Sequence, residues 1–356
     1  QRAQDPACPF LDALSLSMAL EPRLAAYIAA RMPGARDVAV QDLSRISGGA
    51  SRETYRFRLL WNEDGAARER KLILRRDPPA SLIETERRIE FEAYRAFHGS
   101  AVPVPEMLWL EEEDAALDHP FFIAEEIAGF QAGPAALFGP PYAATLGQLG
   151  QRKWTILGEI AKADPAALGL TQVMAPVAPD ACWDRELSYW EGLLDRDEPE
   201  PLPITRAAIR WLRANPPPPA QKLSVVHGDY RTGNFLYDEA GGIHGVLDWE
   251  MCHLGDPLED LGWSFNPVWS FGQGKPGGLL PREEAIAVWE RASGLTADPA
   301  ALHWWELFNC VKGQAIWISS ARVWINGGNR EPIMVYPPWL LQNAQDRATL
   351  QVMGRL

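Results

Sequence analysis

Two short segments in the second half of the chain combine carboxylates with an amide at a spacing suited to phosphoryl transfer. HGDYRTGN runs from His227 to Asn234, and VLDWE contains Asp248. Asp229 follows the apolar run SVV and Asn234 comes five residues later, so one loop can present a carboxylate and an amide oxygen side by side. Magnesium prefers oxygen ligands, which makes Asn234 and Asp248 suitable ligands and leaves Asp229 free to accept a hydroxyl proton.

The surrounding sequence predicts that a β-hairpin positions these residues. FLYD and GVLD flank the turn EAGG and are typical of two short strands. Upstream, β-type runs at 38–46, 53–60 and 71–76, separated by the turns SGGAS and WNEDGAARER, predict an antiparallel sheet. Ser81 and Glu84 have the spacing of a capping box before a helix, and two more strands follow within 101–129. From about Gly129 onward the pattern is mainly helical.

Composition places the chain among globular proteins. Its 356 residues suit two lobes, with 47% hydrophobic and 23% charged residues. No run is long and apolar enough to predict a membrane span, and the early LDALSLSMAL lacks a basic leader, so we expect no signal peptide and a cytoplasmic protein. The four widely spaced cysteines predict neither structural zinc nor a disulfide framework. A net charge of −13 disfavours a nucleic-acid partner.

HGDYRTGN followed by VLDWE resembles the catalytic and metal-binding motifs of the aminoglycoside phosphotransferase family, and GDPLEDLGW is similar to that family as well. The arrangement most resembles the branch that includes the phosphotransferase half of acyl-CoA dehydrogenase fusion proteins. The resemblance implies an α+β, protein-kinase-like bilobal fold. It places a small antiparallel-sheet N-lobe with one main helix at residues 1–125, and a larger, mostly helical C-lobe at residues 126–356.

The resemblance also implies roles in the catalytic segment. Asp229 is the expected catalytic base, Asn234 and Asp248 are the expected Mg²⁺ ligands, and His227 is expected to support the loop. Arg231 could approach the transferred phosphate or lie on the surface.

GDPLEDLGW predicts the start of a helix. Asp256 can cap it, Pro257 fits its first position, and Glu259 completes a D-x-x-E capping box. By resemblance, Asp260 supports the catalytic loop.

The first lobe supplies candidates for binding the nucleotide. SGGASRETY lies between the first two predicted strands, where a kinase-type phosphate loop belongs. Gly48 and Gly49 would let backbone N–H groups approach the phosphates, and Ser51 could add a hydroxyl donor; the alternative is an ordinary turn between strands.

The third strand should carry a cation for the phosphates, and Arg75 occupies the matching position, with Arg76 as the neighbour most easily confused with it. The alternative is an exposed strand arginine. We expect a helical glutamate to pair with this cation and assign Glu90, with Glu86 one turn earlier as the alternative and Glu92 also near.

HPFFIAEEIAG resembles the segment that connects the lobes. Backbone groups from Ala124 to Ile127, including those of Glu125 and Ile127, would hold the adenine edge.

These features predict transfer of the γ-phosphate of ATP, with Mg²⁺, to a hydroxyl of a small molecule. HGD in place of HRD and the absence of A-P-E argue against a protein kinase. GTP is an alternative donor, and aminoglycosides, macrolides and hydroxyacyl-CoA are alternative acceptors; the oligomeric state stays open. Most of the tryptophans after the catalytic segment are expected in the core, and any that line the cleft would indicate an acceptor with an apolar part. The rival interpretation is an inactive nucleotide-binding regulator of the same fold, but the sequence retains the base and both metal ligands.

Overall fold

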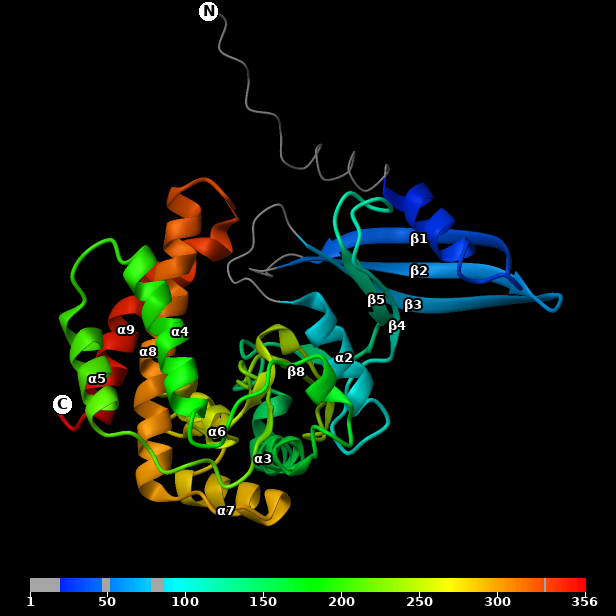
Figure 1. Ribbon diagram of the computed structural model, residues 1–356. Helices are drawn as coiled ribbons and strands as arrows, with labels where there is room; N and C mark the ends of the chain where they lie inside the picture. Colours follow the sequence, from blue (N-terminus) through cyan, green and yellow to red (C-terminus); the bar gives the residue numbers. More distant parts are fainter. Residues whose placement is uncertain (1–19, 47–51, 78–85, 330) are drawn as a thin grey trace, which may run out of the picture. The chain divides into compact units, whose positions relative to one another are not determined.

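Residues 20–46, 52–77, 86–329 and 331–356 are described by the computed structural model (Figure 1). They divide between two units, one within Gln1–Ser81 and Glu106–Ala128 and the other within Leu82–Pro105 and Gly129–Leu356. The first unit is built on an antiparallel sheet and the second is mostly helical, so the α+β fold class is confirmed.

The sheet of the first unit has the strand order β1-β2-β3-β5-β4, and all its neighbouring pairs are antiparallel. Its strands are β1 (Arg36–Ile46), β2 (Glu53–Glu63), β3 (Ala66–Arg76), β4 (Met107–Glu111) and β5 (Phe121–Glu125). The succession of three strands, a helix and two strands matches the order predicted from the sequence.

The connection between β2 and β3 is much shorter than predicted. Most of WNEDGAARER is strand, and only Asp64 and Gly65 form the turn, both at positive φ (52° and 74°). An Asp-Gly pair adopts these angles readily, and the resulting two-residue turn matches the twist of the flanking strands. The polar composition of this segment predicted a loop. In the structure its polar side chains lie on the ends of β2 and β3, which extend beyond the buried core and are exposed or half-buried.

One face of this sheet forms a core with the helix at residues 20–29. Tyr55, Phe57 and Leu59 alternate with exposed or half-buried arginines along β2, as the sequence predicted. Tyr27 of the helix meets Phe121 of β5 edge to face, with ring centroids 4.8 Å apart. The helix therefore seals the apolar face of the sheet.

The second unit contains the remaining helices. They are α2 (Arg87–Phe97), α3 (Leu146–Lys162), α4 (Cys182–Asp197), α5 (Pro203–Ala214), α6 (Leu258–Phe265), α7 (Arg282–Ser293), α8 (Pro299–Ile325) and α9 (Tyr336–Val352). The long α8 is buried along most of its length and contacts α4, α5, α6 and α9 (Figure 1). Within the described ranges, no helix has the length and apolar character needed to cross a bilayer.

Short strands in the second unit carry the catalytic segment. They are β6 (Gln131–Ala132), β7 (Ser224–Val226), β8 (Phe235–Tyr237), β9 (Ile243–Val246) and β10 (His253–Gly255). β8 pairs with β9 as the predicted hairpin, and β7 pairs with β10.

The capping box predicted at Ser81 and Glu84 lies outside the described residues. The described helix α2 starts at Arg87, with Glu86 at the N-cap position making no side-chain cap bond.

A lysine is buried in the core of this unit. Lys153 on α3 is fully buried, and its Nζ has no hydrogen-bond partner among the described residues. The ammonium group lies 4.1 Å from the centroid of the Trp154 ring. Burial lowers the pKa of Lys153 to about 7, because an apolar environment disfavours the charged form.

We therefore predict that Lys153→Met stabilises the protein. Above pH 10.5 the amine of Lys153 is neutral in both the folded and the unfolded state. Between pH 10.5 and about 7 the unfolded chain binds a proton at this amine and the folded chain does not, so lowering the pH favours unfolding of the parent. The gain in the free energy of unfolding should grow over that interval to on the order of 2–4 kcal/mol. Urea denaturation at pH 10.5, 9 and 7 measures it, with Lys162→Met, at an exposed lysine of α3, as control. A gain that is equal at all three pH values would contradict the prediction.

Candidate active site

The β8–β9 hairpin brings two of the predicted residues to one end. Asn234 directly precedes β8, and Asp248 follows β9 by two residues. The N–H of Leu247 donates to the carbonyl of Asn234 at 2.8 Å, which closes this end of the hairpin. Asp248 has φ 70°, and its N–H donates to the hydroxyl of Tyr94 on α2 at 2.8 Å. The amide and the carboxylate are thus presented from adjacent backbone positions.

The carboxylate of Asp229 is held from three directions. Trp263 donates from Nε1 to Oδ1 at 2.7 Å, Asn234 donates from Nδ2 to Oδ2 at 2.6 Å, and Arg231 lies at 3.2 Å through Nε. Only 15% of the side chain is exposed. Burial raises the pKa of Asp229; the charge of Arg231 lowers it, and the charge of Asp248 raises it further. A carboxylate with a raised pKa is a stronger base.

The donor set at this end of the hairpin suits a hard cation. Asn234 uses its Nδ2 for both bonds to Asp229, so its amide oxygen is the atom suited to metal coordination. The negative charge of Asp248 acts on Asp229, and a divalent cation bound by Asp248 would offset that repulsion. Oxygen ligands on a short hairpin therefore fit Mg²⁺.

Two residues predicted as supports bind the backbone of the catalytic loop. Asp260 on α6 accepts the N–H of His227 at 2.6 Å and that of Gly228 at 2.9 Å. The ring of His227 contacts the carbonyl of Leu247 through Nε2 and accepts the N–H of Asp229 at Nδ1. Burial lowers the pKa of His227 to about 4, so the ring is neutral and Nδ1 can act as an acceptor.

Arg231 lies beside the base. Besides its contact with Asp229, its guanidinium group sits 5.1 Å from the centroid of the Trp269 ring. The side chain is 29% exposed, so it is anchored at the loop and still reaches solvent.

The candidates in the first unit are described only in part. Gly48, Gly49 and Ser51 lie outside the described residues. Arg75 is half-buried on β3, opposite Thr54 and Phe122. Its neighbour Arg76 is committed elsewhere, because it binds Glu53 at 2.6 Å and the carbonyl of Leu117 at 3.0 Å. The role of Arg75 as the phosphate cation stays a prediction.

Among the glutamates considered on α2, Glu90 alone is fully buried; Glu86 is exposed and Glu92 pairs with Arg95. Glu90 belongs to the second unit and Arg75 to the first, so their pairing stays a prediction. In the connecting segment, Glu125 is exposed at the end of β5, and its N–H donates to the carbonyl of Glu106 at 2.9 Å. Ile127 is half-buried.

The capping-box interpretation of Glu259 was wrong. Pro257, predicted at the first helical position, is the N-cap of α6, and the side chain of Asp256, one residue earlier, accepts the N–H of Leu258 at 2.9 Å. Glu259, however, is fully buried, and its carboxylate binds His253 at 3.1 Å and Lys312 at 3.1 Å. Two buried cations bind a carboxylate more strongly than one backbone N–H, so tertiary contacts override the local pattern.

Lys312 and Trp263 contact the catalytic loop, and neither role was predicted. Trp263 belongs to the tryptophans most of which were expected in the core, yet its Nε1 donates a hydrogen bond to the carboxylate of Asp229. Lys312 on α8 donates to the carbonyl of Gly228 at 2.6 Å. The sequence does carry one signal: a single lysine within the apolar run NCVKGQAIW, on a helix, is unusual for a buried face.

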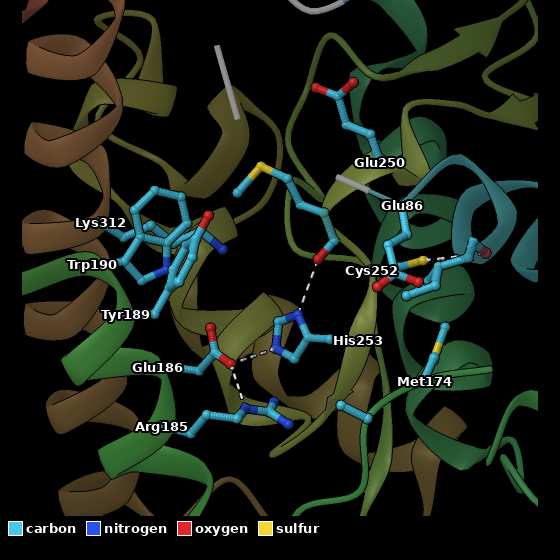
Figure 2. A pocket seen from close by; sticks show the side chains of 13 residues that line it. Glu86, Met174, Arg185, Glu186, Tyr189, Trp190, Glu250, Cys252, His253 and Lys312 are labelled. Atoms are coloured by element: carbon cyan, nitrogen blue, oxygen red, sulfur yellow. Dashed lines mark hydrogen bonds and ion pairs between the residues drawn. The ribbon is translucent and has the colours of Figure 1, made fainter. Parts of the chain in front are cut away.

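A pocket of about 350 Å³ lies beside this loop, within the second unit. Figure 2 shows Tyr189 and Trp190 of α4 on one side and Glu86 on the opposite side, with His253 and Glu186 at the base. Its remaining walls include Ile89, Met174, Met251 and Lys312. Aromatic and methionine side chains thus line much of a cavity large enough for a small molecule.

Glu186, His253 and Glu259 are close enough together to resemble a metal site. Their carboxylates are already bound by cations, since Arg185 lies 2.9 Å from Glu186 and Lys312 lies 3.1 Å from Glu259. Burial alone would lower the pKa of His253, but the two carboxylates raise it to about 9. The cluster is therefore a chain of ion pairs with a protonated histidine at its centre.

Comparison with known proteins identifies the family. A profile of the phosphotransferase enzyme family matches residues 42–305. The chain belongs to this family. Acyl-CoA dehydrogenase family member 10 of Mus musculus is 28% identical over 235 residues, covering 65% of this chain and 21% of that protein. Acyl-CoA dehydrogenase family member 11 of Homo sapiens is 24% identical over 247 residues, covering 63% and 30%. The matches span about a fifth to a third of these relatives.

Solved structures share the fold of this family member. An aminoglycoside phosphotransferase homologue from Ralstonia eutropha superimposes with a TM-score of 0.70 at 18% identity, covering 94% of this chain and 98% of that chain. Aminoglycoside phosphotransferase APH(4)-Ia, in a ternary complex with AMP-PNP and hygromycin B, gives 0.55 at 19% identity, covering 91% and 98%. The ethanolamine kinase of Plasmodium vivax gives 0.56 at 12% identity, covering 88% and 83%. The predicted kinase-like fold and family are confirmed.

The buried neutral ring of His227 predicts a defined acid sensitivity. Its pKa is about 4 in the folded state and 6.5 in the reference state, so the unfolded chain takes up a proton first as the pH falls. Between pH 6.5 and 4 the parent should lose on the order of 3 kcal/mol of stability that His227→Gln does not lose. Urea midpoints across this range measure the difference. His98→Gln, at an exposed histidine, should follow the parent; if His227→Gln follows it as well, the neutral-ring assignment fails.

Proposed function

We propose that this protein transfers the γ-phosphoryl group of ATP to a hydroxyl of a small molecule, with Asp229 as the general base. One observation carries the proposal: a buried carboxylate of raised pKa lies in the loop that leads into the β8–β9 hairpin, and it is hydrogen-bonded to the amide at the end of that hairpin that also carries a second carboxylate. Phosphoryl transfer relies on positioning and charge neutralisation, which such a group of side chains supplies.

In the proposed reaction, the acceptor hydroxyl binds beside Asp229 and gives its proton to the carboxylate. The acceptor oxygen forms a bond to the γ-phosphorus while the bond between that phosphorus and the β–γ bridging oxygen breaks, and ADP leaves. Trp263 and Asn234 orient the carboxylate. Arg231, already against Asp229, would neutralise charge on the transferred group.

Asn234 and Asp248 would hold Mg²⁺, which offsets the negative charge of the phosphates when bound. Gly48, Gly49 and Ser51 would cover the phosphates, Arg75 would bind them, and Glu90 would pair with Arg75. The backbone at Glu125 and Ile127 would receive the base of the nucleotide. Structural neighbours have been solved both with an ATP analogue and with GDP, which supports a nucleoside triphosphate donor. ATP is our first choice and GTP the comparison.

The pocket beside the loop is our proposed site for the apolar part of the acceptor. Trp190 and Met174 offer apolar surface there, whereas Arg185 and Lys312 are committed to protein oxygens. The curated relatives are named as acyl-CoA dehydrogenase family members, so hydroxyacyl-CoA thioesters come first among acceptors, ahead of aminoglycosides such as hygromycin B. Cys182, Cys252 and Cys310 are free thiols, which supports a reducing compartment such as the cytoplasm.

Asp229→Asn should abolish most turnover. The substitution removes the base but keeps the shape of the side chain, so kcat should fall by about 10²–10⁴-fold while the affinity for ATP stays near that of the parent. Transfer of labelled phosphate to hydroxyacyl-CoA and aminoglycoside panels, with ATP and with GTP, measures it. Asp238→Asn, at a carboxylate of the β8–β9 turn that binds His244, is the matched control. An undiminished rate in Asp229→Asn would remove Asp229 as the base.

The metal assignment has a separate test that needs no acceptor. In the parent, ATP at about 100 times its Kd should stabilise the fold by about 2.7 kcal/mol, and omitting Mg²⁺ should remove much of this gain. Asp248→Asn should make stabilisation by ATP nearly independent of Mg²⁺, because one of the two oxygen ligands loses its charge. Thermal shift assays with and without EDTA give the answer. Equal Mg²⁺ dependence in Asp248→Asn and the parent would refute the assignment.

A further inference from the structure

The peptide bond between Gly228 and Asp229 carries the proposed base and is held at both of its polar ends. Its carbonyl oxygen, on Gly228, accepts a hydrogen bond from Lys312 Nζ at 2.6 Å. Its N–H, on Asp229, donates to His227 Nδ1 at 3.2 Å. Asp260 binds the two preceding N–H groups and does not reach this peptide. The orientation of the peptide therefore depends on Lys312 and His227.

The backbone at this point needs such a restraint. Gly228 has φ 85°, and a Cβ there would lie 2.4 Å from the carbonyl oxygen of Met251. Only glycine fits this position, and glycine leaves the neighbouring peptide free to rotate unless other groups hold it. A rotated peptide would turn the Gly228 carbonyl away from Lys312 and displace the side chain of Asp229.

Lys312 is itself fixed in place by its surroundings. Its side chain is 1% exposed, and Nζ also binds Glu259 at 3.1 Å. The ammonium group lies 5.1 Å from the ring centroid of Trp263 and 5.6 Å from that of Trp190. Trp263 is the residue that binds the carboxylate of Asp229. Lys312 thus contacts the backbone that carries Asp229 and also packs on the indole of Trp263, which orients the side chain of Asp229.

We propose that Lys312 is a positioning residue of the phosphotransferase reaction: its ammonium group fixes the Gly228–Asp229 peptide and thereby aims the Asp229 carboxylate at the acceptor. This inference rests on the proposed function. It assigns to helix α8 a direct part in arranging the catalytic loop. Lys312 also lines the pocket proposed for the acceptor (Figure 2), so one side chain joins the wall of that pocket to the base.

The main alternative is that Lys312 serves only to neutralise Glu259. The double variant Lys312→Met/Glu259→Gln separates the two roles, because it removes the amine and the charge that the amine would leave unpaired. Single Lys312→Met and the double variant are compared with Lys153→Met, which removes another fully buried lysine of the same unit, one with no hydrogen-bond partner among the described residues.

Two measurements are made on each protein. Steady-state phosphate transfer gives kcat and the KM for ATP, and hydrogen exchange followed by mass spectrometry reports on the peptide that covers residues 227–234. We expect Lys312→Met and the double variant to lose about 10- to 100-fold in kcat, with little change in the KM for ATP. Exchange in 227–234 should accelerate by about tenfold in both. Lys153→Met should keep the kcat of the parent, and its exchange in 227–234 should be no faster than that of the parent, because loss of this lysine is expected to stabilise the fold.

Melting temperatures complete the comparison. The double variant should melt closer to the parent than the single variant does, and its kcat should stay low. Recovery of kcat together with stability would overturn the proposal, because Lys312 would then act only through Glu259. Unchanged exchange in 227–234 would overturn it as well. If the parent transfers no phosphate to any acceptor, the proposed function fails, and accelerated exchange in Lys312→Met still decides whether Lys312 holds the loop.

Discussion

The catalytic loop is an irregular stretch of backbone buried inside a helical unit, and its polar groups need partners that no regular strand or helix provides. Side chains from distant helices supply them. Asp260 of α6 accepts two N–H groups, and Ser264 of the same helix donates to the carbonyl of Tyr230. Lys312 of α8 donates to Gly228. The packing of α6 against α8 follows from this requirement as much as from apolar burial, because both helices must reach the same loop.

Several of the side chains around the catalytic loop are charged, and burying a charge costs desolvation free energy. The structure offsets this cost by placing groups of opposite charge next to one another. Arg185, Glu186, His253, Glu259 and Lys312 form a chain in which each charge contacts one of opposite sign. Burial acts to raise the pKa of Glu259, but the charges of Lys312 and His253 outweigh it and lower that pKa. The ionised carboxylate of Glu259 is a buried partner for Lys312, whose Nζ also donates to the loop carbonyl of Gly228.

Local patterns were enough to predict the parts of the site that are close in sequence. Asp229, Asn234 and Asp248 belong to one strand–loop–hairpin segment, so spacing and strand propensity indicated that they lie together. Trp263 and Lys312 lie tens of residues downstream, and their contacts arise from helix packing, which sequence periodicity does not specify.

Two local patterns gave wrong predictions, for different physical reasons. The D-x-x-E pattern at α6 has the spacing of a cap, but burial of Glu259 between two cations gives the side chain stronger partners. The polar run between β2 and β3 indicated a loop, yet backbone pairing continues across it because the Asp64-Gly65 turn fits a hairpin. At α6 tertiary contacts overrode the local pattern, whereas between β2 and β3 a local Asp-Gly turn outweighed the polar composition of the segment.

The ion-pair chain also constrains what the neighbouring pocket can recognise. Because His253 has a pKa of about 9, it stays protonated near neutral pH and forms ion pairs with Glu186 and Glu259. An anionic group that enters the pocket would have to compete with Glu186 and Glu259 for His253, at a penalty on the order of several kcal/mol for an uncompensated buried ion. Glu86 and Glu250 also line the pocket and would repel an anion, whereas Trp190 and Met174 offer apolar surface. The pocket should therefore accept an apolar part of a ligand and leave any anionic part outside.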